Sequence, residues 1–180
     1  FYALRSETRD LGREATDQER SAYLFLVSQV DHQMLFRISH PKISREHFVA
    51  LDKALRSAQV WGDVVAVSLG ELAYPDLVAE VADLLLSYES ARFVLCCGRY
   101  KTKAYLSLRT EASEGRAGGL MRQIIAADGA AGGHGTMAGA RLFALFQDDQ
   151  ALEVVFAEIV QRFLRALGRT VSQAVPLVDR

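Results

Sequence analysis

The sequence predicts an α/β protein whose mixed sheet is flanked by helices. Three observations carry this prediction. The run 63–70 is rich in β-branched residues and bounded by glycine, which is typical of a strand buried on both faces. Two further strand-like runs, 93–97 and 104–108, follow an amphipathic segment, and a fourth at 138–146 precedes a long amphipathic helix. The order strand, helix, strand, strand, helix, strand, helix favours one sheet with mixed strand directions.

The composition is that of an ordinary folded chain with little net charge. Of its 180 residues, 50% are apolar and 24% are charged, which suffices for one or two small domains. The formal net charge of −1 argues against a basic surface that wraps long nucleic acid, whereas a mononucleotide needs only a few local arginines. No apolar run is long enough to span a bilayer, so we expect no membrane partner. The adjacent Cys96 and Cys97 are expected to be buried reduced thiols, which favours a cytoplasmic location.

The first forty residues differ in pattern from the rest of the chain. The residues 1–4 read as the middle of a strand, and the chain does not begin with methionine, so we expect a fragment of a longer protein. A helix capped by Thr16 or Asp17 follows, and then a short amphipathic element at 32–38.

Helices connect and cover the predicted strands. Ser44 begins a helix within 41–62, and we interpret this segment as a linker between two domains. Farther along, Asp76 is expected to cap a helix with one apolar stripe, on which Glu80 and Asp83 face solvent.

A glycine-rich stretch at 129–142 is where glycine, a titratable side chain and a strand-like run converge. Gly132 and Gly133 allow the backbone to come close to a ligand, and successive N–H groups in such a loop can form an anion-binding concavity. His134 adds a donor or a positive charge beside it. This combination indicates a phosphate site, although a tight connection without a ligand remains the simpler alternative.

A strand-like alternation upstream offers a second set of phosphate contacts. It ends in Ser107, Arg109 and Thr110, and a guanidinium can hold a phosphate through two parallel hydrogen bonds. Arg122, on the short helix before the glycine stretch, is expected to face the same site.

Together the two motifs resemble the DHHA1 domain of the DHH phosphoesterases. Those proteins carry an S-x-R-S type strand and a G-G-H-x-x-A-G type loop that hold the substrate phosphate, and Thr110 stands here for the last serine. The resemblance implies a DHHA1-like substrate-binding domain at 63–180, after the linker helix at 41–62. It also implies that 1–40 is a remnant of the catalytic DHH domain, including a strand.

The resemblance further implies a metal site, most of which lies outside this chain. The segment 6–8 would match a T-D-T type motif and make Glu7 a ligand of Mn²⁺ or Mg²⁺, while a solvated charge cluster is an equal alternative. The sequence contains no Asp-His-His. We therefore expect metal ions in the full-length protein and none bound by this chain alone.

The function implied by the resemblance is that of a phosphoesterase half that binds substrate. Its ligand would be the phosphate of a nucleotide or short oligonucleotide. The backbone of the glycine pair would form the cradle, and four side chains would donate to the phosphate: Ser107, Arg109, Thr110 and His134. In this interpretation the chain alone is inactive, and a homodimer remains open.

Two alternative functions also fit the sequence. One is a nucleic-acid-binding accessory module, and the other is a polyphosphate or pyrophosphate hydrolase. Aromatic side chains that stack on bases would separate them, and the candidates are Tyr100 and Tyr105.

Overall fold

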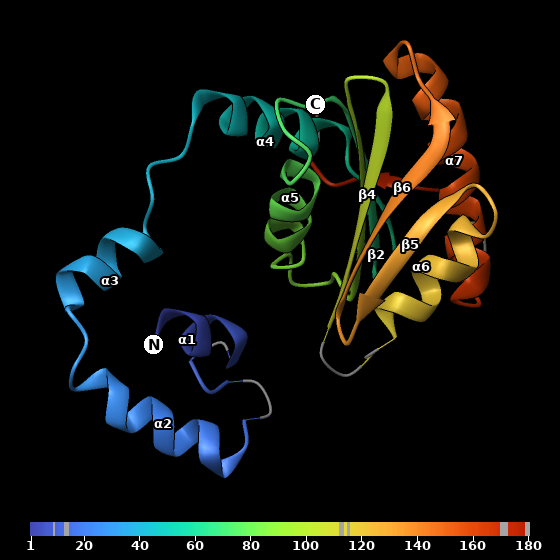
Figure 1. The fold of residues 1–180 in the computed structure, drawn as a ribbon. Coiled ribbons are helices and arrows are strands. Elements are labelled where there is room, and N and C mark those ends of the chain that lie inside the picture. The colour runs from blue at the N-terminus through green and yellow to red at the C-terminus, as the bar shows by residue number, and fades with distance from the viewer. Residues whose placement is uncertain (9, 13–14, 112–113, 115, 170–172, 179–180) are drawn as a thin grey trace. The chain divides into compact units, whose positions relative to one another are not determined.

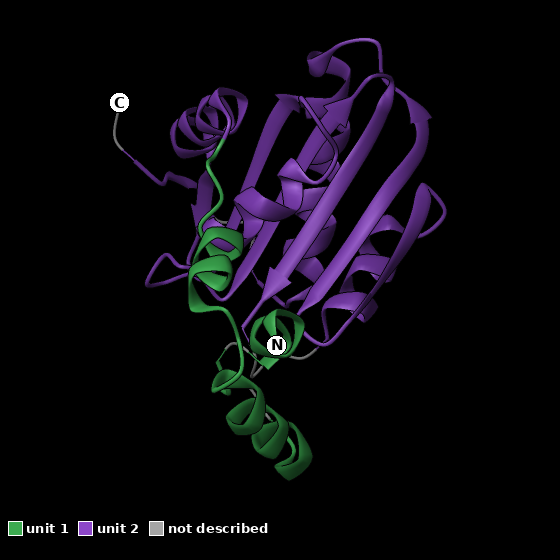
Figure 2. Ribbon diagram, turned by 60° about the vertical axis from the view of Figure 1, so that its left-hand side comes forward, with its two compact units in different colours: residues 1–43 green, residues 44–180 purple. Residues whose placement is uncertain are grey.

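The computed structural model describes the chain except residues 9, 13–14, 112–113, 115, 170–172 and 179–180 (Figure 1). The described residues form two compact units, 1–43 and 44–180, shown in two colours in Figure 2. Among the described residues, no helix combines the length and apolar character needed to cross a membrane.

The first unit consists of three helices, α1 (Tyr2–Thr8), α2 (Asp17–Val27) and α3 (His32–Ser39). Thr16 caps α2 in a capping box, because its hydroxyl accepts from the Glu19 N–H while its own N–H donates to the Glu19 carboxylate. Asp31 caps α3, where its carboxylate accepts from two N–H groups of the first turn.

The strand expected at residues 1–4 is wrong, because these residues enter helix α1. The Arg5 N–H donates to the Phe1 carbonyl at 2.9 Å, and the Phe1 ring packs edge-on against Tyr23 at 4.9 Å between centroids. A short apolar run has no periodicity that distinguishes a strand from a helix. Here the run leads into a helix, and its first residue packs against Tyr23 of α2.

The second unit is a seven-stranded mixed sheet with helices on both faces. Its elements are α4 (Arg45–Ser57), β1 (Gln59–Trp61), β2 (Val64–Glu71), α5 (Leu77–Leu85), β3 (Phe93–Tyr100), β4 (Lys103–Thr110), α6 (Ala117–Ile125), β5 (Gly129–His134), β6 (Met137–Leu145), α7 (Asp149–Ala166) and β7 (Val175–Pro176). The strand order is β5-β6-β4-β3-β2-β1-β7, and among these described strands only β2 and β3 pair in parallel. The predicted α/β class with a mixed sheet is therefore confirmed.

An apolar layer lies between the sheet and the helices on each of its two faces. One layer joins α4 and α5 to the face of the sheet that carries Val65, Val94 and Cys96. The other joins α6 and α7 to the opposite face, with Leu95 and Phe163 among its fully buried side chains. Burial raises the pKa of the Cys96 thiol well above its usual range, and that of its neighbour Cys97 likewise, so both stay protonated at neutral pH.

Helix α4 is part of the sheet unit. Its Ala50 and Ala54 are buried in the same apolar layer as α5, and the boundary between the units falls between Ile43 and Ser44. The predicted cap of α5 is only partly right, because Asp76 precedes the helix without a side-chain capping bond in the described structure. Near the end of the chain β7 pairs with β1, where the sequence shows no pattern.

Candidate functional site

Helices α4 and α5 cover their face of the sheet only as far as β4, so the neighbouring strands β6 and β5 remain open on that side (Figure 1). Side chains alternate between the faces of a strand, and the register therefore places every second residue of β4, β6 and β5 on the open face. Three cross-strand rows result, which run from β5 through β6 to β4: His134, Met137, Arg109; Gly132, Gly139, Ser107; Ala130, Arg141, Tyr105.

The middle row makes the open face concave. It consists of two glycines and a serine, between two rows in which most side chains are long. A Cβ added to Gly132 would meet no described atom within 4 Å, and one added to Gly139 would meet only the Leu106 carbonyl, at 3.6 Å. The result is a groove of about 490 Å³, lined by the three strands and by the start of α5. A volume of this size is typical of a small-molecule site.

The predicted glycine loop is a β-hairpin. Gly132 and His134 belong to strand β5, and the turn lies at Gly135, whose φ of +50° suits glycine. In a strand the N–H groups lie in the plane of the sheet and do not converge on one point above it. The glycines therefore contribute room for a ligand rather than the predicted cradle of N–H donors.

Gly133 has a structural reason to be glycine. A Cβ there would clash with the Met137 carbonyl and lie 2.5 Å from Ala138 Cα on the neighbouring strand. From the other side, a Cβ on Gly118 would clash with the Gly133 carbonyl, so α6 approaches β5 as closely as the backbone permits. These contacts fix β5 against β6 and α6.

Arg109 is held in one orientation by neighbours on two elements. Its Nε and Nη2 donate to the two carboxylate oxygens of Asp83 at 2.7 and 3.3 Å, and its Nη1 donates to Ser107 Oγ at 2.8 Å. The Arg109 side chain is 12% exposed and lines the groove. A guanidinium fixed in this way needs little reordering when an anion arrives, because its rotamer is already selected.

Asp83 is exposed, as predicted, and it also pairs with Arg109 on β4. Its pairing with Arg109 depends on the register between α5 and β4, which the sequence does not reveal. Glu80 is also engaged, since it accepts from the Tyr74 hydroxyl at 2.9 Å and lies 2.9 Å from His47 Nδ1.

His134 and Arg141 line the groove with side chains that have no polar partner among the described residues. Both are exposed. An imidazole has at least one N–H donor and a guanidinium has five, so both side chains can receive an anionic ligand. The sequence pattern singled out His134 and missed Arg141, which is recognisable only from the β5–β6 register.

Two predicted contacts do not reach the groove. Thr110 lies on the opposite face of β4, 2% exposed, with a buried Oγ1 that has no hydrogen-bond partner among the described residues. Its backbone N–H donates to the Thr136 carbonyl, so Thr110 supports the hairpin turn instead. Arg122 projects from α6, which packs against that same opposite face.

The expected metal ligand belongs to the other unit. Glu7 is an exposed residue of helix α1, whereas its motif implied the end of a strand. The described residues contain no group of three or more His, Cys, Asp and Glu side chains that fits a metal ion.

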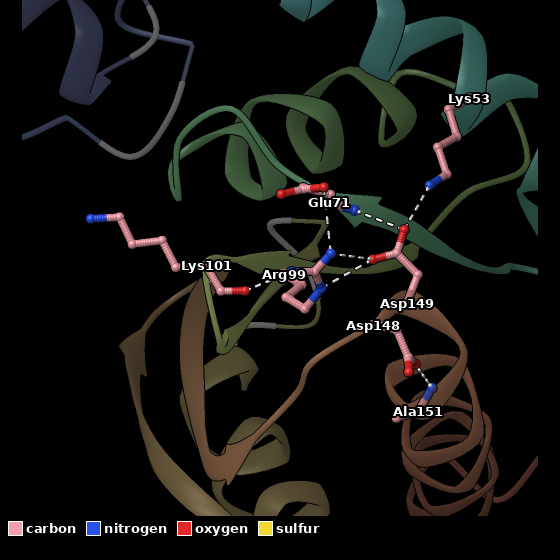
Figure 3. A network of polar contacts seen from close by, with 7 residues as sticks. All are labelled: Lys53, Glu71, Arg99, Lys101, Asp148, Asp149 and Ala151. Atoms are coloured by element: carbon pink, nitrogen blue, oxygen red, sulfur yellow. Dashed lines mark hydrogen bonds and ion pairs between the residues drawn. The ribbon is translucent and has the colours of Figure 1, made fainter.

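A second polar network lies at the carboxyl ends of the central strands β2 and β3 and connects several elements (Figure 3). Arg99, 11% exposed, donates to Asp149 Oδ1 at 3.1 Å and to the Lys101 carbonyl at 2.7 Å. Asp149 Oδ2 accepts from the Glu71 N–H at 3.1 Å and lies 3.6 Å from Lys53 Nζ. These contacts join α4, β2, β3 and α7.

No protein-family model matches the chain. It is 27% identical over 174 residues to the uncharacterized protein MJ1633 of Methanocaldococcus jannaschii, covering 93% of this chain and 36% of that protein. The chain thus spans about a third of the length of the curated relative it matches.

Solved structures place the chain in a known fold. An exopolyphosphatase-related protein from Bacteroides fragilis has a TM-score of 0.63 at 14% identity, over 89% of this chain and 48% of that one. The DHH domain of a protein from a ribosomal protein family has a TM-score of 0.45 at 14% identity, over 76% of this chain and 33% of that one. The first likeness shows that the chain shares the fold of this exopolyphosphatase-related protein, as expected for the α/β class predicted from the sequence.

Proposed function

We propose that this chain is the substrate-binding part of a metal-dependent phosphoesterase that acts on nucleotide phosphates or short oligonucleotides. The observation that carries the proposal is the oriented Arg109, which lines a concave open face together with His134, whose ring has no polar partner among the described residues. A phosphate in the groove accepts from Arg109 and His134 above the floor at Gly139. The name of the exopolyphosphatase-related neighbour supports phosphate chemistry.

The catalytic metal ions belong to residues outside this chain in the proposed enzyme. Mn²⁺ or Mg²⁺ would supply an activated water for attack on phosphorus. The described residues of this chain bind and orient the phosphate. We therefore expect the isolated chain to bind substrate without turnover, and a phosphodiesterase assay with Mn²⁺ checks this; clear turnover by the chain alone would contradict it.

The binding test uses 3′-phosphoadenosine 5′-phosphate, a short oligoribonucleotide and tripolyphosphate, each titrated calorimetrically. His134→Ala is expected to weaken nucleotide binding at least tenfold, or about 1.4 kcal/mol. Arg122→Ala is the matched control, because this exposed arginine projects from α6 on the opposite face of the sheet.

The same titrations separate the alternative functions. A preference for tripolyphosphate would favour a polyphosphate hydrolase. A steep loss of oligonucleotide affinity with rising salt would favour an accessory nucleic-acid module, because each released counterion adds to the slope. Equal affinity of the parent and His134→Ala would show that the phosphate site lies elsewhere.

A further inference from the structure

The face of the sheet that lies under α7, opposite the phosphate groove, holds a separate apolar groove between α7 and β1. Its volume is about 350 Å³, which lies in the range of small-molecule sites. Small side chains account for this space, because Ala66 on β2 and Ala157 on α7 stand where larger residues would fill it. The register of β1, β2 and β3 places these lining residues on the face that α7 covers: Gln59, Trp61, Ala66 and Ser68.

The walls of this groove are largely apolar, and two of them are aromatic. From α7 come the buried side chains of Phe156, Val160 and Leu164. From β1 comes the half-buried ring of Trp61, which packs against the same apolar layer. Aromatic rings offer a large rigid surface to a planar ligand, and they stack on it or meet it edge-on. The shape and the lining therefore favour a flat ring system.

One polar group of the groove is unsatisfied. Ser68 Oγ is buried and has no hydrogen-bond partner among the described residues. A buried hydroxyl without a partner costs free energy, and a ligand that bonds with it removes that cost. The carboxamide of Gln59 lines the same groove, also without a side-chain partner in the described part of the chain. Hydroxyl and carboxamide groups can each donate and accept, as can a carboxamide on a ligand.

The charge of the lining separates this groove from the phosphate groove. The described residues that line it include one carboxylate, Glu153, and no lysine, arginine or histidine. An anion would lose hydration here, find no cation and meet the Glu153 carboxylate. An uncharged ligand avoids all three costs. The two grooves should therefore select ligands of different charge.

We propose that the apolar groove between α7 and β1 binds an uncharged, planar aromatic ligand that carries a carboxamide-like group. The ring of the ligand packs against Trp61 and Phe156, and its polar group bonds with Ser68 Oγ. This site goes beyond the proposed function, because it lies on the opposite face of the sheet and does not depend on the phosphate groove.

The test observes Trp61 directly by NMR. Trp61 is the one tryptophan of the chain, so its indole N–H gives a single cross-peak in a nitrogen–proton correlation spectrum. Titration with quinoline-3-carboxamide is expected to shift this peak until it saturates. The matched anion, quinoline-3-carboxylate, has the same ring and nearly the same size, and should bind at least tenfold more weakly. Equal affinity for the two compounds, or no saturable shift with the carboxamide, would refute the proposal.

Variants locate the ligand within the groove. Ser68→Ala should weaken the carboxamide at least fivefold and leave resistance to urea unchanged or higher, because it removes an unsatisfied hydroxyl. Ala157→Phe should abolish binding, because its ring occupies the space above β2. The matched control is Val154→Phe, which changes an exposed α7 residue outside the groove lining and should leave binding within twofold.

Each pattern of results decides the proposal. If Ala157→Phe fails to fold, Ser68→Ala carries the test, because the loss of a hydroxyl leaves no overpacking. Unchanged affinity in Ser68→Ala, or a loss of stability that accompanies the loss of binding, would show that Ser68 is structural and refute the assignment. Carboxamide binding that disappears in His134→Ala would place the ligand in the phosphate groove and also refute it. Failure to bind phosphate ligands would overturn the proposed function and leave this site standing.

Discussion

The two halves of the sheet differ in how they are closed. In the β2–β3 half, both faces are covered by helices and residues 93–98 of β3 are buried without interruption. In the β5–β6 half, one face is covered by α6 and α7, while the other carries glycine, alanine and the groove-lining polar side chains. The closed half supplies stability, and the open half supplies a surface that a ligand can occupy. Substitutions in the two halves should therefore change different properties.

The largest effect is expected in the closed half. Phe163 is fully buried and packs edge-on against Phe93 at 6.2 Å between centroids. Phe163→Ala should lower the free energy of unfolding by about 3–5 kcal/mol, because it removes a large buried side chain and leaves a cavity. Urea denaturation measures this. The control is Phe143→Ala on the open half, where the ring is 61% exposed and the expected change is within about 0.5 kcal/mol.

Substitutions of two neighbouring glycines in β5 should affect different properties: one should lower stability, and the other should weaken ligand binding. Gly133→Ala forces a methyl group against the Ala138 backbone at 2.5 Å, so we expect a loss of about 1–3 kcal/mol in unfolding free energy. Gly132→Ala meets no described atom within 4 Å and should leave stability nearly unchanged, but its methyl group projects from the open face between the groove-lining Ala130 and His134 and should weaken nucleotide binding. Urea denaturation and calorimetric titration of both variants measure the two effects, and the reverse assignment would show that the register of β5 is wrong.

The ion pair that orients Arg109 should contribute more to stability than a largely exposed one. Asp83→Ala leaves the 12% exposed Arg109 without its carboxylate, and we expect a loss of about 1–2 kcal/mol in unfolding free energy together with weaker phosphate binding. The control is Asp52→Ala, whose partner Arg56 is 71% exposed, with an expected change below about 0.5 kcal/mol. Similar small changes in both variants would show that Asp83 does not hold Arg109.

The smallest effect is expected when the folded chain is treated with a thiol reagent, because both cysteines lie in the closed half. Cys96 and Cys97 are fully buried, and burial raises their thiol pKa, so neither should react with a disulfide reagent in the folded chain at a pH of about 8. After denaturation both should react. Rapid labelling of the folded chain would mean that the sheet opens locally near β3.

The strands and helices of the closed half could be predicted from the sequence because their apolar residues follow clear patterns. The β-branched run at 63–70 and the strands at 93–97 and 104–108 were predicted in place, as was the amphipathic helix that became α7. For residues 1–4 the same reasoning failed, because a few apolar residues without periodicity fit a helix as well as a strand.

The groove of the open half could be predicted only in part, because its geometry depends on the register between strands. Ser107, Arg109 and His134 were predicted together, and the sheet brings all three to one groove. Thr110 was assigned to the same site although strand alternation sends it to the other face. The roles of two further residues were missed, because both depend on long-range pairing. The β5–β6 register brings Arg141 to the groove, and the packing of α5 on β4 brings Asp83 to Arg109.

The most direct test of the phosphate site maps the ligand on the 19.9 kDa chain by amide chemical shifts during a titration with adenosine 5′-monophosphate. We predict that the shifts concentrate on β4, β6 and β5 around Arg109 and His134, and that His134→Ala abolishes them at the same ligand concentration. Shifts that gather instead at the apolar groove between α7 and β1, near Trp61 and Phe156, would contradict the assignment of the open face as the phosphate site.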